Sequence, residues 1–267
     1  MKFGVLTLQN APWPELVERW RLLDELGIET IWVADHVAPR ADWQWFDGWS
    51  CLTALAYVTE QARIGPLVSP MTLRNPAVLA RTALTVAELS GGRLELGVGS
   101  GGGELDREAA GVPDWSPKER AGLFAEWVER LTGYLADERL QPKRPVPLTI
   151  GGHGPTVLRL AAEHAHRWNA FGGMGLSAEE GLERCRRDNE RLDELSAGTG
   201  RTVLRSALVG YPFVAERPWL SEEAWHDFVG RWEAAGFDEL VLFYPWDWQM
   251  PEGSVEPGLP ERMLGKG

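Results

Sequence analysis

The chain has 267 residues, of which 44% are hydrophobic and 25% charged, as expected of a globular protein and not of a disordered one. Acidic side chains outnumber basic ones by 39 to 27, and the net charge of −12 argues against nucleic acid or an anionic membrane as the main partner. The length suits one large barrel or two small domains.

The cysteines and the N-terminal segment point to a cytoplasmic protein. Cys51 and Cys185 stand alone, without a CxxC pair or a Cys/His cluster at zinc spacing, which is typical of reduced thiols and predicts no metal site. The segment MKFGVLTLQ has no apolar stretch of signal-peptide length, and no apolar run approaches the ~20 residues that span a bilayer.

Along the first half of the chain, short β-rich segments alternate with longer segments of helical periodicity. The predicted strands are 3–8, 30–34, 63–69 and 93–99. The first helix ends at Gly27, and the helix before the fourth strand begins at Asn75 and Pro76, a good N-cap and first helical position.

The second half continues the same alternation. The predicted strands are 147–150, 167–171, 203–209 and 239–244. Ser116 and Glu119 form a capping box at the start of one helix, another opens at Pro155, and Ser177 caps a third. A last amphipathic helix is predicted over 221–235.

Eight strands that start on average about 34 residues apart match the size of a βαβ unit. Either an open doubly wound sheet or a closed barrel fits this alternation, and eight units in this length favour the α/β class (β/α)8 TIM barrel. No Pro/Gly/Ser-rich linker divides the chain, so we expect residues 1–267 to form one domain.

In such a barrel the active site lies at the carboxyl ends of the strands. The fifth strand runs directly into Gly151, Gly152, His153 and Gly154 and then into a helix. Free backbone amides and the positive end of the helix dipole make this turn a candidate phosphate site, to which Thr156 could add a hydroxyl. The alternative is a tight turn that needs glycine only for its positive φ.

The fourth strand leads into a second glycine-rich segment. Gly97, Gly99 and Gly102 match GxGxxG, but the following residues 103–108 carry no apolar helix face, which argues against a Rossmann turn. These glycines either let a flat ligand approach the backbone or form a plain flexible loop.

His36 directly follows the second strand and should lie at the barrel mouth, beside Asp35, which could orient it as a general acid or base. The alternative is a hydrogen-bonded structural histidine. His164 and His166 lie near a predicted helix C-terminus, where histidines complement the helix dipole, and no HExxH motif is present, so a metal-dependent hydrolase is not expected.

The loop 42–49 after the second strand is rich in aromatic residues. Trp43, Trp45 and Trp49 suggest a wall for an apolar or planar substrate. A hydrophobic plug on the barrel or a dimer contact would fit the same residues.

Five segments together resemble the luciferase-like monooxygenase superfamily: IWVADH (31–36), LRNPAVLA (73–80), ELSGGRLELGVGSG (88–101), IGGHGPTVLRLAAEHA (150–165) and RWN (167–169). The resemblance covers about residues 1–245. It implies a TIM barrel that binds FMN or the deazaflavin F420 at its mouth, and either hydride transfer or flavin-hydroperoxide oxygenation of a small organic substrate.

The resemblance also implies roles for residues. A non-proline cis peptide would lie near Pro66–Leu67, beneath the cofactor ring, and the loop tryptophans would cover the substrate side. His36 would move a proton, held by Asp35 or a backbone carbonyl. The implied cofactor contacts are Leu67, Val68, Ser69, Gly99, Ser100, Gly101, Gly151, Gly152, His153, Gly154 and Thr156.

Two departures from the family pattern matter. Some F420-dependent relatives place a proton-donating glutamate where this chain has Gly102, so the sugar-phosphate dehydrogenase branch is not expected. The segment 137–146 is short, whereas many relatives carry a longer insertion at this place, and such insertions shape the substrate pocket.

The sequence narrowly favours FMN over F420, because the polyglutamate tail of F420 suits a basic groove and this chain is acidic. The Asp-His pair is nevertheless common among F420 users, so an F420-dependent dehydrogenase or reductase is the alternative to a monooxygenase-type enzyme. A non-catalytic flavin-binding barrel would fit the same residues, whereas a cofactor-free hydrolase has no nucleophile elbow to support it. The resemblance further implies a homodimer and a flavin or F420 reductase that supplies reduced cofactor.

Overall fold

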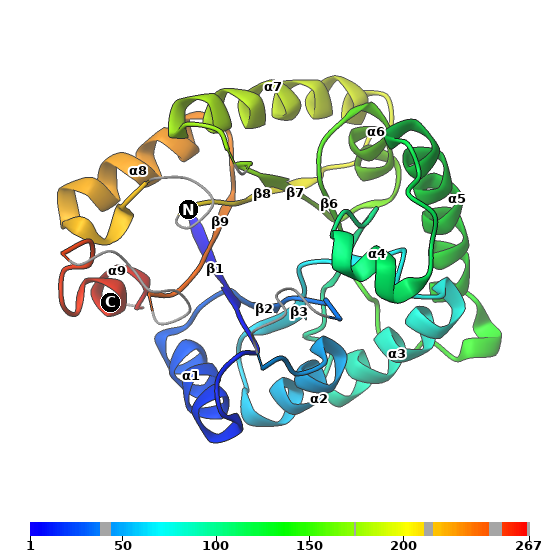
Figure 1. Ribbon diagram of the computed structural model, residues 1–267, viewed down its shortest axis with the longest axis horizontal. Coiled ribbons are helices and arrows are strands. Elements are labelled where there is room, and N and C mark those ends of the chain that lie inside the picture. Colours follow the sequence, from blue (N-terminus) through cyan, green and yellow to red (C-terminus); the bar gives the residue numbers. More distant parts are fainter. Residues whose placement is uncertain (38–43, 174, 211–215, 246–252, 266–267) are drawn as a thin grey trace.

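The computed structural model describes residues 1–37, 44–173, 175–210, 216–245 and 253–265. Its strands are all parallel, and the helices surround them (Figure 1). The strands are β1 Lys2–Thr7, β2 Thr30–Val33, β3 Arg63–Pro66, β4 Ser69–Pro70, β5 Leu96–Gly99, β6 Leu148–Gly151, β7 Arg167–Phe171, β8 Leu204–Leu208 and β9 Glu239–Leu242. The sheet order β3-β2-β1-β9-β8-β7-β6-β5-β4 closes through a bridge between Ile64 and Leu94. The predicted TIM barrel is therefore confirmed.

The third barrel strand differs from its prediction as one continuous strand. It is split into β3 and β4 by a cis peptide bond between Leu67 and Val68, one bond further along the chain than expected. Each piece pairs separately, since β3 lies against β2 and β4 lies against β5. The chain between them bulges so that Val68 lines the cavity and packs against Gly99, Gly151 and the apolar cluster inside the barrel.

The helices are α1 Trp13–Leu26, α2 Gly48–Val58, α3 Pro76–Leu89, α4 Glu104–Ala110, α5 Pro117–Leu135, α6 Pro155–His164, α7 Ala178–Ala197, α8 Glu222–Ala234 and α9 Leu259–Leu264. Their predicted ends are largely confirmed. Gly27 closes α1 in the left-handed conformation (φ 77°), and Asn75 caps α3. The capping box of Ser116 and Glu119 is present at α5.

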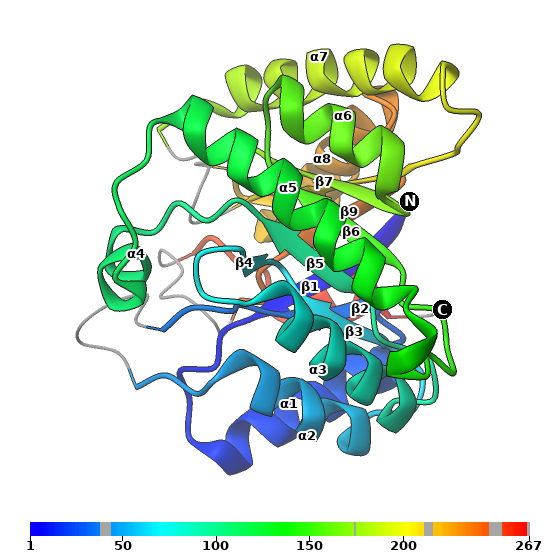
Figure 2. The ribbon, with the colours of Figure 1, turned by 90° about the vertical axis from the view of Figure 1, so that its right-hand side faces the viewer.

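Helix α4 is not predicted from the sequence, because residues 103–108 lack an apolar face. It forms a short helix at the end of the barrel opposite the chain termini (Figure 2). Its one buried side chain is Asp106, so a polar contact and not apolar packing holds α4 on the mouth.

Apolar side chains fill two layers. The larger cluster lies between strands and helices and includes the helix residues Trp20, Trp127 and Trp232. The smaller one lies inside the barrel and comprises Leu6, Leu8, Trp32, Ala34, Leu67, Leu208, Val241 and Phe243. Burial raises the pKa of the Cys51 and Cys185 thiols to about 12, so both stay protonated. In the described part of the chain, no helix is both long and apolar enough to cross a membrane.

Charged residues close the amino-terminal end of the barrel. Glu95 is fully buried and accepts hydrogen bonds from Arg167 Nε (2.6 Å), Arg63 Nε (3.0 Å) and Thr149 Oγ1 (2.5 Å). Arg167 also forms an ion pair with the buried Glu239. Burial alone would raise the pKa of Glu95, but the hydrogen bond and charge of Arg167 outweigh it and hold this pKa below its usual range.

Glu95→Gln should lower the free energy of unfolding at pH 7 by about 3 kcal/mol or more, because it leaves Arg167 and Arg63 underpaired in the barrel. Since the folded-state pKa of Glu95 is depressed, its contribution is present above about pH 4.3 and is lost as the pH falls through the folded pKa. The difference in free energy of unfolding between the wild type and Glu95→Gln, measured by urea denaturation, should therefore become smaller toward low pH. Glu163→Gln, which breaks an exposed pair with Arg159, is the control and should cost at most about 0.5 kcal/mol.

Candidate active site

A cavity of about 660 Å³ opens at the carboxyl ends of the strands. Its size suits a ligand as large as a cofactor ring with a small substrate. Its floor is apolar and is made of Leu6, Leu8, Ala34, Leu67, Phe171, Leu208 and Phe243. Its polar side chains are His36, Ser100, Asp106, Arg120 and Asn169. A ligand here would therefore meet an apolar floor and a few polar side chains around it.

The bulge of the third strand fits this cavity because its neighbours are glycines. A Cβ atom at Gly99 would lie 2.6 Å from Val68 Cγ2, and one at Gly151 would lie 2.9 Å from Val68 Cγ1. A Cβ atom at Gly97 would lie 2.1 Å from the carbonyl oxygen of Pro66. Packing alone therefore requires glycine at these positions, because a Cβ atom would overlap Val68 or the Pro66 carbonyl whether or not a ligand is bound.

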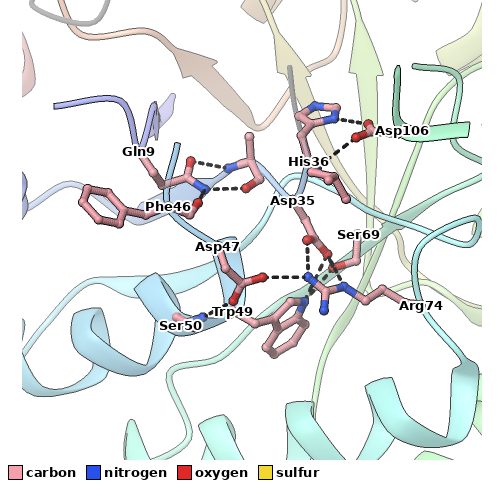
Figure 3. A network of polar contacts seen from close by, with 12 residues as sticks. Gln9, Asp35, His36, Phe46, Asp47, Trp49, Ser50, Ser69, Arg74 and Asp106 are labelled. Carbon is pink, nitrogen blue, oxygen red and sulfur yellow. Dashed lines mark hydrogen bonds and ion pairs between the residues drawn. The ribbon is translucent and has the colours of Figure 1, made fainter. Parts of the chain in front are cut away.

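His36 and Asp106 form a pair at the edge of the cavity. His36 Nδ1 lies 2.5 Å from Asp106 Oδ2, and the backbone amide of Val37 donates to Asp106 Oδ1 at 2.9 Å (Figure 3). Asp106 is only 6% exposed, whereas His36 is 41% exposed. His36 Nε2 forms no hydrogen bond within the described part of the chain, so this nitrogen is available to a ligand. The Trp45 indole N–H donates to the His36 carbonyl at 3.0 Å.

The expectation that Asp35 orients His36 is wrong. Figure 3 shows the two side chains pointing away from each other. Successive residues of an extended strand face opposite sides, so Asp35 turns toward the helix layer while His36 turns toward the mouth. The Asp35 carboxylate accepts hydrogen bonds from Ser69, Trp49 and Arg74 instead.

Asp106 is the site residue that sequence reasoning missed. The segment around it has no apolar periodicity, and the pair with His36 spans 70 positions of the chain. The one available signal is the run of glycines before it, which can precede a helix start. The polar character of the following residues points the other way, because a surface helix normally presents an apolar face to the core.

The predicted cofactor contacts divide into two groups. Leu67, Val68, Gly99, Ser100, Gly101, Gly151 and Gly152 line the cavity. Ser69, His153, Gly154 and Thr156 do not. Ser69 donates to Asp35 at 2.6 Å, and His153 contacts Asp188 through Nδ1 (2.5 Å) and the Phe171 carbonyl through Nε2 (2.6 Å). His153 therefore holds α7 against the end of β7.

The turn after β6 also fits a purely conformational role for its glycines. Gly152 and Gly154 have positive φ angles of 120° and 97°, which favour glycine for conformational reasons. The Gly152 amide already donates to the Asn169 carbonyl at 3.0 Å. The backbone geometry alone thus accounts for these two glycines.

Of the three tryptophans expected around the substrate, only Trp45 lines the cavity within the described residues. Trp49 is buried, and its indole N–H lies 3.0 Å from Ser69 Oγ and 3.2 Å from Asp35 Oδ2. It lies in the first turn of α2 and supports the ends of β2 and β4 from behind. Trp43 lies outside the described residues.

One rim of the cavity is suited to an anion. Arg120 reaches it from the first turn of α5 and has no acidic partner among the described residues. The backbone amides of Gly101, Gly102 and Gly103 likewise have no acceptor in the described ranges. A cation beside successive free amides is a common arrangement for binding a phosphate or carboxylate.

Comparison with known proteins identifies the family. The family model described as luciferase-like monooxygenase matches residues 1–249. The chain belongs to this family. Among solved structures, an F420-dependent secondary alcohol dehydrogenase in complex with an F420–acetone adduct matches with a TM-score of 0.76 and 16% identity, over 91% of this chain and 92% of that chain. At this identity the likeness shows the shared barrel fold of the luciferase-like proteins.

Curated relatives of this luciferase-like chain include two kinds of oxidoreductase. The F420-dependent glucose-6-phosphate dehydrogenase of Amycolatopsis mediterranei is 30% identical over 67% of this chain and 62% of its own length. The 5,10-methylenetetrahydromethanopterin reductase of Archaeoglobus fulgidus is 28% identical over 84% of this chain and 75% of its own length. The chain thus spans about three fifths of the length of such glucose-6-phosphate dehydrogenases, with 58% for the one from Kineococcus radiotolerans.

Gly99→Ala should lower the free energy of unfolding by about 1–3 kcal/mol, because the new methyl group would overlap Val68. Combining it with Val68→Ala should recover part of this loss, since the smaller side chain removes the overlap. Denaturant melts of the two single variants and the double variant measure the coupling. Strictly additive losses would contradict the packing of Val68 on Gly99.

Proposed function

We propose that this protein is an F420-dependent oxidoreductase that transfers a hydride between the deazaflavin and a small organic substrate. The observation that carries the proposal is the His36–Asp106 pair, whose free Nε2 lies beside an apolar cavity with the Val68 bulge in its wall. The similarity in sequence to F420-dependent dehydrogenases supports this cofactor over FMN.

The residues present fit such a cofactor. Leu67, Val68 and the small residues Gly99–Gly101 offer a flat, apolar seat for a ring. Arg120 and the amides of Gly101–Gly103, which have no acceptor among the described residues, offer charge and hydrogen bonds to a phosphate. Gly151 and Gly152 line the cavity beside Val68. When bound, F420 supplies a hydride acceptor or donor that the protein's own side chains lack.

His36 is the group proposed to move a proton at the substrate. Asp106 accepts the Nδ1–H, which leaves Nε2 able to accept a proton in the neutral ring and to donate one in the imidazolium. Because Asp106 also accepts from the Val37 amide, its carboxylate is fixed in place and so is the ring it holds. The Trp45 ring lies beside His36, with ring centroids 6.5 Å apart, and in the cavity wall it would help to exclude water.

An FMN-dependent monooxygenase is the second candidate. The net charge of −12 disfavours binding of the polyglutamate tail of F420. The fold also matches a type II Baeyer–Villiger monooxygenase from Pseudomonas putida in complex with FMN. The TM-score is 0.61 at 17% identity, over 78% of this chain and 66% of that chain. The same apolar seat would accept either ring. A reductase partner, a homodimer and a cytoplasmic location stay predictions.

Titration of the apoprotein with F420 and with FMN separates these candidates. Saturable quenching of F420 fluorescence, with weaker binding of FMN, is the expected result. Tight binding of FMN alone would favour the monooxygenase, and binding of neither would contradict both.

His36→Ala should lower turnover on the order of 100-fold, the usual contribution of a general acid or base, without changing the Kd of the cofactor. Asp106→Asn should lower turnover in the same direction, because the ring loses its charged partner. His226→Ala on the exposed face of α8 is the control and should match the wild type. Unchanged turnover in His36→Ala would remove this histidine from the mechanism.

A further inference from the structure

The Asp35 carboxylate is buried next to the cavity and accepts hydrogen bonds from three side chains. The proposed chemistry does not use this carboxylate directly. Its side chain is 2% exposed. Oδ2 accepts from Ser69 Oγ at 2.6 Å, from Arg74 Nε at 2.9 Å and from Trp49 Nε1 at 3.2 Å. A second guanidinium nitrogen of Arg74 donates to Oδ1, which makes the ion pair bidentate.

This ion pair joins the two main-chain segments that build the site. Asp35 directly precedes His36 at the end of β2, and Ser69 is the first residue of β4 after the Leu67–Val68 bulge. Arg74 comes from the loop between β4 and α3, and its carbonyl accepts from the Trp127 indole of α5 at 2.9 Å. The ends of β2 and β4 are thus tied at one point.

Arg74 acts from behind His36 and not on the substrate. It does not line the 660 Å³ cavity. With Asp35 and Asp47 it lines a separate hollow of about 350 Å³, which shares His36 and Trp45 with the main cavity. His36 therefore lies between the ion pair and the space proposed for the ligands.

We propose that Arg74 is a positioning residue: through Asp35 it fixes the end of β2 against β4, so that His36 meets Asp106 and faces the cavity. This inference rests on the proposed function for its catalytic consequence. Without Arg74, the buried carboxylate would have to take up a proton or admit water, and either change loosens the end of β2. A buried ion pair adds little net stability over apolar packing, so geometry is the better reason for its presence.

The first test uses the cofactor-free protein. Histidine side chains are labelled with ¹³C and ¹⁵N, and the His36 signal among the five histidines is assigned from its loss in His36→Ala. Arg74→Gln should shift the His36 ring signals. Arg74→Lys should shift them less, because lysine keeps the positive charge but cannot bind the carboxylate through two nitrogens. Ser69→Ala, which leaves the ion pair in place, should cause a smaller shift. Arg74→Lys serves as the test if Arg74→Gln does not fold.

Asp47→Asn is the matched control. It removes the other acidic partner of Arg74, at 3.2 Å, while asparagine can still cap α2 in place of Asp47. The His36 signals should stay where they are in the wild type. Unmoved His36 signals in a folded Arg74→Gln or Arg74→Lys protein, or equal shifts in Asp47→Asn, would overturn the positioning role.

The second test is kinetic. Arg74→Gln should lower kcat about tenfold, as expected for a small misplacement of a catalytic group, with the Kd of the cofactor changed no more than about twofold. In the His36→Ala background the same substitution should have no further effect on kcat, because Arg74 acts through His36. An additive loss would instead indicate a general structural role. If the wild type shows no F420-linked activity, the proposed function fails, while the spectra still decide whether Arg74 positions His36.

Discussion

The contact between Val68 and the glycines of β5 and β6 is the constraint on which the mouth of this barrel depends. The third strand can bulge inward only because Gly99 and Gly151 present no Cβ atom to the valine side chain. The bulge separates β3 from β4 and brings Leu67 and Val68 to the wall of the cavity. It also places Ser69 where it can bond to Asp35 and so reach the segment that carries His36.

Along the barrel axis, the side chains inside the barrel change in character from one end to the other. The amino-terminal end is closed by the buried charges of Glu95, Arg167 and Glu239, and the middle is filled by an apolar cluster. Polar groups line the mouth, where His36 and Asp106 lie beside the apolar floor. In the proposed function, a planar cofactor and a small substrate would be held by apolar contact, while the imidazole of His36 would exchange protons with the substrate.

Local and periodic features were predictable from the sequence. The end of α1 at Gly27 and the cap of α3 at Asn75 depend on residues that are neighbours in the sequence. The barrel could be predicted from the alternation of strands and helices and from the number of strands. The partner of His36 was not predictable in the same way, because Asp106 lies on a polar helix that tertiary contact alone holds in place. Adjacency in the sequence suggested Asp35, but the alternation of side chains along a strand sends it to the other face.

We expect the deazaflavin ring to bind against the Val68 bulge, in the same cavity as the His36–Asp106 pair. A crystal structure of the protein with F420 is the direct test. It should show the ring in contact with Leu67 and Val68, the phosphate of F420 near Arg120 or the Gly101–Gly103 amides, and the bond between His36 Nδ1 and Asp106 intact. A ring bound outside this cavity, or a His36 side chain turned away from it, would rule out this arrangement.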